Sequence, residues 1–138
     1  MNYLRVDDAL LARIKGQFEL RTPNFEAVES VAIAISEFLD VNQESDTYTC
    51  IVDAATGVGK TFVMAGLIEY LSQERGWRNF IIVTPGVIVR DKTIANFTHG
   101  NDRSLVDCIS LPVEVITSEN FNKTSTATLM DDTNNIKV

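Results

Sequence analysis

The sequence has few of the residues that build disulfide frameworks and metal centres. Its two cysteines, Cys50 and Cys108, each stand beside a β-branched residue, which favours buried free thiols in a reducing compartment over a disulfide or a metal pair. The single histidine, His99, has no second histidine or cysteine nearby, so we expect a loop residue at the surface. No serine–histidine–aspartate or cysteine–histidine arrangement indicates nucleophilic catalysis. A metalloprotein, a disulfide scaffold and a triad hydrolase are therefore all disfavoured.

Long apolar runs and an excess of positive charge are also missing. No apolar stretch approaches the ~20 residues of a membrane span, and the first eight residues, with Asp7 and Asp8, do not resemble a signal peptide. The formal net charge of −7 argues against a simple basic nucleic-acid-binding module. Only the middle of the chain, residues 47–100, is not acidic, with four acidic residues against five basic ones. We therefore expect a cytoplasmic protein with no membrane partner and an anion site in its middle.

That middle contains a glycine-rich loop. A strand candidate, Tyr48–Val52, leads into the loop, and a helix candidate, Phe62–Leu71, follows it. This strand–loop–helix order is what a phosphate-binding loop requires. Gly57 and Gly59 have no Cβ, so the loop can wrap tightly and aim several backbone N–H groups at one polyphosphate. The N-terminus of the following helix adds unpaired N–H groups and its positive dipole end.

The loop residues have separate expected roles. The predicted nucleotide-binding residues are Ala55, Thr56, Gly57, Val58, Gly59, Lys60 and Thr61. Lys60 would neutralise the β- and γ-phosphates, and the Thr61 hydroxyl would take one coordination position on Mg²⁺. These two residues are therefore the catalytic candidates, and Thr61 is the metal candidate.

The order of the apolar patterns predicts an α/β fold with a mostly parallel sheet flanked by helices. Residues 1–46 read as an N-terminal helical segment, and residues 47–138 read as the first part of a nucleotide-binding domain. The predicted helices are Leu4–Ile14, Thr22 to Leu39, one from Lys60, and Val87–Phe97. The predicted strands are Tyr48–Val52, Asn79–Val83, Leu105–Ile109, Val113–Thr117 and one from Ile136. Lys123–Asn135 is predicted to be an exposed loop. Because the chain stops on the first residues of a strand, we expect it to be a piece of a longer protein.

Two further turns follow strand candidates. They are Thr84–Pro85–Gly86 and Thr117–Ser118. In open parallel sheets, ligands lie at the carboxyl ends of the strands, so both turns are expected on the same edge as the glycine-rich loop. Small turns that expose backbone N–H groups can hold the phosphates of a polymer without reading its bases.

The motifs resemble those of superfamily-two DEAD/DEAH-type helicases and translocases. Residues 54–61 look like motif I, which in this superfamily commonly has alanine in place of the first glycine. Residues 83–86 resemble motif Ia, and residues 115–118 stand where motif Ib is expected. Residues 76–97 are similar to the motor (Res) subunit of type III restriction enzymes, and the whole resemblance covers about residues 20–138.

The resemblance implies a partial RecA-like P-loop NTPase domain that uses ATP and Mg²⁺ to move on duplex DNA. ATP would lie between this domain and a second RecA-like domain, and a modification or nuclease module is a further expected partner. The residues that would contact the phosphate backbone of one DNA strand are Thr84, Pro85, Gly86, Thr117 and Ser118.

The sequence departs from the family pattern in two places. No Asp-Glu-x-His/Asp box occurs, and the nearest acidic pair, Asp131–Asp132, follows no apolar strand. Where many members carry an adenine-reading glutamine, Pro23–Asn24–Phe25 is followed by Glu26. Without the acidic box the phosphoryl-transfer machinery is incomplete, so this chain alone is expected to hydrolyse little ATP.

Two other functions remain open on the sequence. One is a P-loop kinase or other phosphotransferase acting on a small molecule, and the other is a non-catalytic nucleotide-binding fragment. An acidic box at a strand end beyond residue 138 would support the motor, and an arginine-rich lid there would support the kinase.

Overall fold

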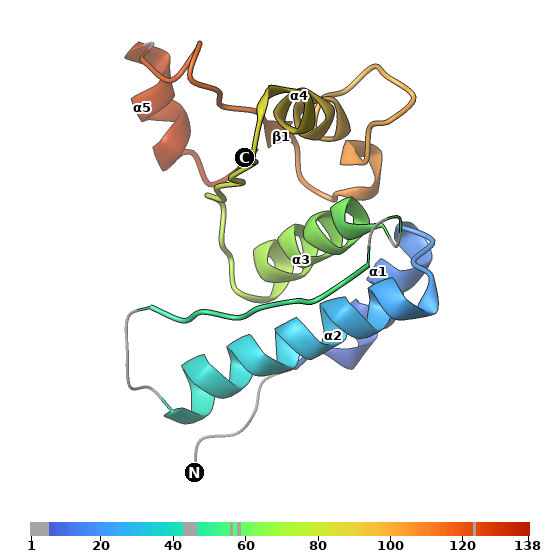
Figure 1. The fold of residues 1–138 in the computed structure, drawn as a ribbon. Helices are drawn as coiled ribbons and strands as arrows, with labels where there is room; N and C mark the ends of the chain where they lie inside the picture. The colour runs from blue at the N-terminus through green and yellow to red at the C-terminus, as the bar shows by residue number, and fades with distance from the viewer. Residues whose placement is uncertain (1–5, 43–46, 56, 58, 123) are drawn as a thin grey trace. The chain divides into compact units, whose positions relative to one another are not determined.

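The computed structural model describes residues 6–42, 47–55, 57, 59–122 and 124–138. The chain forms two compact units, Met1–Glu74 and Arg75–Val138. Figure 1 labels the helices α1 to α5 and the strand β1. The predicted division between residues 46 and 47 stays a prediction.

The first unit is a small helical assembly. Its elements are α1 (Asp8–Gln17), α2 (Thr22–Ser36), a π-helical turn η1 (Glu37–Asn42) and α3 (Lys60–Glu74). Helix α3 packs against both α2 and α1. The buried apolar residues between them include Leu11, Ile14, Val28, Ala32, Ala65, Ile68 and Tyr70. The predicted helices from Thr22 and Lys60 are confirmed, with Pro23 in the first turn of α2, where its missing N–H costs no helical hydrogen bond.

Helix α1 begins later than its apolar pattern predicted, because Asp7 caps it. The Asp7 Oδ1 accepts a hydrogen bond from the Leu10 backbone N–H at 2.8 Å, which satisfies one of the unpaired N–H groups of the first turn. The helix runs on past the predicted end at Ile14 to Gln17, with Gly16 inside it. Residues 4 and 5 of the predicted helix lie outside the described residues.

Replacing Asp7 with alanine should lower the free energy of unfolding of the protein by about 1 kcal/mol, because the capping bond is lost. Urea denaturation followed by circular dichroism would measure the change. Asp8→Ala is the matched control, since it removes the same charge from an exposed first-turn residue that makes no capping bond. Equal losses in the two variants would show that charge, and not the hydrogen bond, accounts for the effect.

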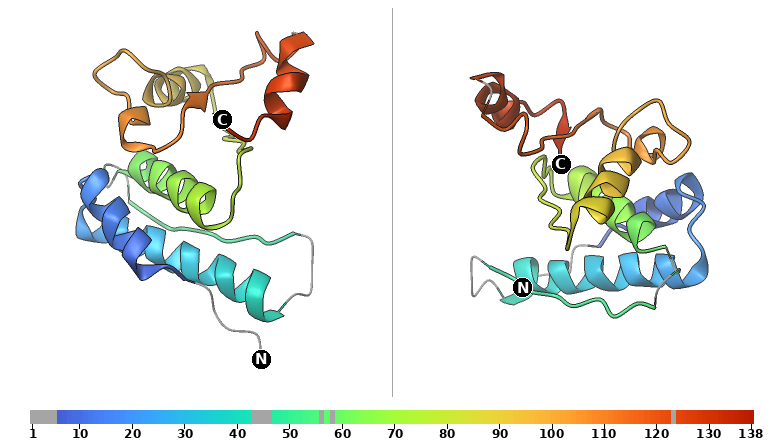
Figure 2. Two further views of the ribbon diagram at one scale, coloured as in Figure 1. Left: turned by 180° about the vertical axis from the view of Figure 1, so that it is seen from behind. Right: turned by 45° about the horizontal axis from the view of Figure 1, so that its top comes forward.

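The predicted strand Tyr48–Val52 is an extended stretch without strand pairing. Figures 1 and 2 show it running back along α2, and the Tyr48 ring stacks on Phe38 with 4.8 Å between centroids. Ile51 is 89% exposed. The prediction of a strand is therefore wrong for this chain. A strand needs a neighbour for its backbone groups, and the described residues of the first unit contain no second strand.

The second unit combines helices with a small parallel sheet. Its elements are α4 (Val87–Asn96), a 3₁₀ turn η2 (Val106–Cys108), β1 (Val113–Glu114), α5 (Thr124–Asp131) and β2 (Ile136–Lys137). Strands β1 and β2 pair in parallel, with Val113 opposite Ile136 and Glu114 opposite Lys137. On the other side of β2, Asn79 forms a parallel bridge with Lys137. The predicted helix from Val87 and the predicted strand from Ile136 are confirmed.

The stretch Asn79–Val83 was predicted as a strand buried on both faces, and this is wrong. Its pairing ends after the Phe80 backbone N–H donates to the Lys137 carbonyl at 2.9 Å. Ile81 and Val83 are 90% and 88% exposed. Because β2 is only two residues long, the rest of the stretch has no paired neighbour and no layer that covers its outer face.

Two other predicted strands are shortened or replaced by local hydrogen bonds. Residues 105–109 form the turn η2, in which the Cys108 and Ile109 backbone N–H groups donate to carbonyls three residues earlier. Strand β1 ends at Glu114, ahead of a turn in which the Asn120 side chain accepts from the Thr117 N–H at 2.7 Å. An asparagine that bonds the backbone in this way competes with strand pairing.

The predicted exposed loop Lys123–Asn135 contains the helix α5. Thr126 is buried, and its hydroxyl donates to the Asn120 carbonyl at 2.9 Å, which joins the helix to the turn before it. Lys123 lies outside the described residues. The prediction was wrong because a polar composition is typical of a loop, whereas these residues form a helix that contains one buried threonine.

The fold class is thus confirmed only in its coarse form. The chain is a mixed α/β protein with parallel pairing, but the described residues are mostly helical and their sheet has two strands. The predicted sheet of several parallel strands is therefore reduced, in the described residues, to one pair of short strands. Parallel strands pair across long sequence separations, so each depends on neighbours that local patterns do not specify.

Candidate functional site

The glycine-rich loop has the backbone conformation that the sequence led us to expect. Gly57 and Gly59 have φ angles of +80° and +91°, in the left-handed region that residues with a Cβ rarely adopt. Ala55, the first of the predicted nucleotide-binding residues, is exposed. Thr56 and Val58, two of the predicted nucleotide-binding residues, lie outside the described residues. The described part of the loop therefore has the left-handed backbone conformation that favours glycine.

Helix α3 starts directly after this turn. The Gly59 carbonyl accepts hydrogen bonds from the backbone N–H groups of Phe62 at 3.0 Å and Val63 at 3.3 Å, which begins the helix. Lys60 is the first residue of α3 and is exposed, and Thr61 is half-buried beside it. The positive end of the helix dipole and the Lys60 side chain thus stand together at the end of the loop. An anion would be stabilised there by both.

The first turn of α2 contacts the same loop, which the sequence did not reveal. The Arg21 Nη2 donates to the Gly57 carbonyl oxygen at 3.3 Å. A Cβ at Gly59 would lie 2.9 Å from the Asn24 Nδ2, closer than such atoms approach one another. The sequence does show that a helix starts some 35 residues before the loop. The spacing of apolar residues, however, cannot predict which helix end contacts which loop.

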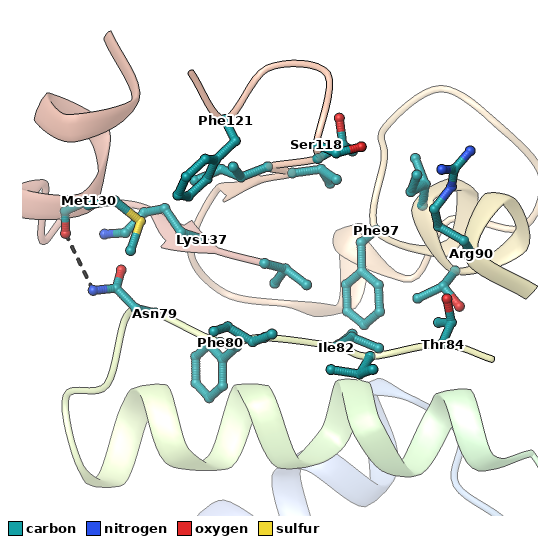
Figure 3. A pocket seen from close by; sticks show the side chains of 18 of the residues that line it. Asn79, Phe80, Ile82, Thr84, Arg90, Phe97, Ser118, Phe121, Met130 and Lys137 are labelled. Carbon is teal, nitrogen blue, oxygen red and sulfur yellow. Dashed lines mark hydrogen bonds between the residues drawn. The ribbon is translucent and has the colours of Figure 1, made fainter. Parts of the chain in front are cut away.

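The second unit contains a pocket of about 840 Å³. Three of the predicted DNA-contacting residues, Thr84, Thr117 and Ser118, line it together, whereas Pro85 and Gly86 do not. Figure 3 shows Ile82 and Phe97 among its side chains, with Thr84 and Arg90 at one end. Two of the predicted turns therefore do meet. That they lie on the same sheet edge as the glycine-rich loop remains a prediction.

The lining of this pocket is mostly apolar, and its two cationic side chains have partners. Arg90 donates through Nε and Nη2 to the Asp91 Oδ1 at 3.1 and 3.0 Å. Lys137 is buried, and its ammonium group donates to the backbone carbonyls of Asp132 and Asn135. Hydroxyl and amide groups, and not free charged side chains, are therefore the polar groups that this pocket offers to a ligand.

Two other residues that the sequence singled out, Asp132 and His99, have partners of their own. The Asp132 carboxylate accepts from the Asn134 backbone N–H at 2.8 Å and from the Asn135 Nδ2 at 3.0 Å, so it stabilises the turn between α5 and β2. His99 is exposed in the loop after α4, with its Nδ1 3.4 Å from the Asp107 Oδ1.

Among the described residues, no helix combines the length and the apolar character that a membrane crossing requires.

A left-handed glycine turn that opens a helix with lysine and threonine is an arrangement found in phosphate-binding loops in general. A family model gives the class of protein to which the chain belongs. The model described as "Type III restriction enzyme, res subunit" matches residues 17–138, and the chain belongs to that family, a helicase-related family of the DEAD/DEAH type. No curated protein and no solved structure shows significant similarity to the chain.

Proposed function

We propose that this chain is the N-terminal ATP-binding part of an ATP-dependent DNA translocase or helicase, built on a RecA-like domain that the longer protein completes. The observation that carries the proposal is the pair of left-handed glycines, Gly57 and Gly59, placed directly before Lys60 at the start of α3. In the longer protein a second RecA-like domain would close over the nucleotide, and a modification or nuclease module would accompany the motor. Such a protein would work in the cytoplasm.

The described residues fit a nucleotide with Mg²⁺. Gly59 supplies the left-handed turn that leads into α3, Lys60 supplies an exposed ammonium group, and Thr61 supplies a hydroxyl in the first turn of α3. Lys60 would bind the β- and γ-phosphates, and Thr61 would be a ligand of Mg²⁺, which neutralises phosphate charge when bound. The remaining loop residues, from Ala55 to Gly59, would contribute backbone N–H groups.

The experiment that tests the proposal is ATP hydrolysis by the full-length protein with and without duplex DNA. We expect hydrolysis that DNA stimulates and that requires Mg²⁺. A protein that binds neither ATP nor DNA, or whose hydrolysis does not respond to DNA, would contradict the proposal.

For DNA we propose contacts to the phosphate backbone by the two turns of the second unit. Thr84, Thr117 and Ser118 present hydroxyl groups at one pocket, and Pro85 and Gly86 continue the first turn. Neutral donors of this kind position a strand without selecting its sequence. We therefore expect DNA binding that does not depend on base sequence in this part of the protein.

Replacing both Thr84 and Thr117 with alanine should raise the DNA concentration that gives half-maximal ATP hydrolysis by about tenfold, because two hydrogen bonds of about 1 kcal/mol or less each are lost. Hydrolysis without DNA should not change. Thr98→Ala is the matched control, because the Thr98 hydroxyl donates to the Ile94 carbonyl at 2.7 Å and does not line the pocket. An unchanged response to DNA in the double variant would exclude these turns as the contact.

A further inference from the structure

The strand β2 and the residue after it have a paired neighbour on each side. On one side, the Val138 N–H donates to the Glu114 carbonyl at 3.0 Å, and the Val138 carbonyl accepts from the Ile116 N–H at 2.8 Å. On the other side, the Lys137 carbonyl accepts from the Phe80 N–H at 2.9 Å. These hydrogen bonds set the register of two parallel neighbours, one on each side of β2.

Both neighbours present further backbone groups beyond the end of this pairing. In an extended strand the N–H and C=O of one residue point to the same side, and the side alternates along the chain. The carbonyl groups of Phe80 and Ile82 and the N–H groups of Ile82 and Thr84 therefore point to the same side as the Phe80 N–H. The Ile116 carbonyl points toward them from the other neighbour. No described residue hydrogen-bonds to any of these groups.

The pocket of the second unit lies between these two rows of backbone groups. Its lining includes the whole stretch Asn79–Thr84 on one side, residues 115–118 on the other, and Val138. Figure 3 shows Asn79 and Thr84 along one side of the pocket, with Ser118 and Phe121 across from them. Neighbouring strands lie about 4.8 Å apart, so two strands on either side of a third are separated by about 10 Å. The pocket thus continues the space that β2 occupies, and it has the width of one strand.

The lining of the pocket indicates what kind of occupant it fits. Unpaired N–H and C=O groups on both sides, two residues apart, match the peptide units of an extended chain better than a small apolar molecule, which would leave them unsatisfied. Ile82, Phe97 and Met130 are among the apolar side chains of the lining, and a strand buried among such residues is itself a nearly continuous apolar run. A segment joined covalently to Val138 enters with the right direction and register at little cost in loop-closure entropy. A segment from a second copy has no such advantage.

We infer that the segment that follows Val138 in the longer protein continues β2 into this pocket and pairs with both neighbours as a buried parallel strand. The inference rests on the proposed function, which supplies the longer protein, and it adds the segment that fills the pocket. The first residue of that segment bonds to the Phe80 carbonyl and the Ile82 N–H, and the second bonds to the Ile116 carbonyl. The third bonds to the Ile82 carbonyl and the Thr84 N–H.

This strand would also position the two turns for which we propose DNA contacts. Thr84 and Thr117 follow the two neighbours of the inserted strand, so they would be held about two strand spacings, or about 10 Å, apart. Their hydroxyl groups remain at the end of the sheet, where the inserted strand does not cover them. The segment after Val138 therefore has a positioning role, and it need not contact DNA itself.

The test is amide hydrogen exchange, resolved by residue, in the full-length protein and in the chain of residues 1–138. The Ile82 and Thr84 N–H groups should exchange at least about 100-fold more slowly in the full-length protein, because only there are they paired. The Phe80 N–H, which already donates to Lys137, should be protected in both and shows that this unit is folded. Equally fast exchange of Ile82 and Thr84 in both proteins would overturn the inference. Protection in residues 1–138 that is lost on dilution would overturn it too, because a second copy would then fill the pocket.

Ile82→Asp in the full-length protein should speed exchange of the Thr84 N–H by at least about tenfold, because it places a charge beside an apolar buried strand. Ile88→Asp is the matched control, since Ile88 is 73% exposed on α4 and does not line the pocket. Exchange of Thr84 that is unaffected by Ile82→Asp, or equally affected by both variants, would contradict the inference.

The amino-acid sequence after Val138 gives a second check that does not depend on how the variants fold. Its first three residues should be uncharged and mostly apolar. Charged residues at these positions would overturn the inference and leave the proposed function intact. The proposed function is decided separately, by whether DNA stimulates ATP hydrolysis.

Discussion

Replacing Lys60 with alanine is expected to lower DNA-stimulated ATP hydrolysis by the full-length protein at least about 100-fold. Removing one preorganised group that stabilises developing charge typically costs this factor or more, and phosphoryl transfer depends almost entirely on such groups. Lys60 stands at the positive end of α3 with its side chain in solvent, so its loss removes charge and not packing. The stability of the first unit should therefore not change.

The measurement is the steady-state rate of phosphate release at saturating ATP and DNA, together with the dissociation constant for ATP. Lys92→Ala is the matched control, because Lys92 is an exposed lysine on α4 and its loss gives the same change in net charge. We expect the control to retain its rate. Equal rates in the wild type and in Lys60→Ala would remove the basis for assigning the loop to phosphate binding.

The loop and its helix could be predicted because both depend on local sequence. Glycines at two positions and a lysine–threonine pair at a helix start are recognisable from spacing alone, and the structure has Gly57, Gly59 and α3 where that spacing placed them. The start of α2 at Thr22–Pro23 was recognisable for the same reason, since proline in the first helical turn is a local signal.

The sheet could not be predicted in the same way. Tyr48–Val52 and Asn79–Val83 have the apolar, β-branched composition of buried strands, yet Ile51, Ile81 and Val83 are almost fully exposed. Composition indicates that a stretch suits a strand, but pairing and burial depend on whether another strand lies beside it. The contact of Arg21 and Asn24 with the loop escaped prediction for a related reason, because it depends on how two helices pack and not on either helix alone.

Replacing Gly59 with alanine should weaken ATP binding by about tenfold or more, through two separate effects. A residue with a Cβ at a φ of +91° costs about 1–2 kcal/mol, which corresponds to about a tenfold change in an equilibrium constant. In addition, the new Cβ would stand 2.9 Å from the Asn24 Nδ2, so the loop or the Asn24 side chain must move. If the loop adopts a different backbone conformation, its N–H groups no longer converge on one phosphate group.

Two further variants separate these effects. Gly76→Ala introduces a Cβ at a φ of +71°, at a position with no atom within 4 Å, so it should cost stability through strain and leave ATP binding unchanged. The double variant Gly59→Ala with Asn24→Ala removes the crowding but keeps the strain, and it should recover only part of the affinity. Isothermal titration with ATP and urea unfolding of each variant would give both quantities. Binding by Gly59→Ala at the wild-type affinity would show that the loop accepts phosphate in a different conformation from the one that Gly57 and Gly59 adopt here.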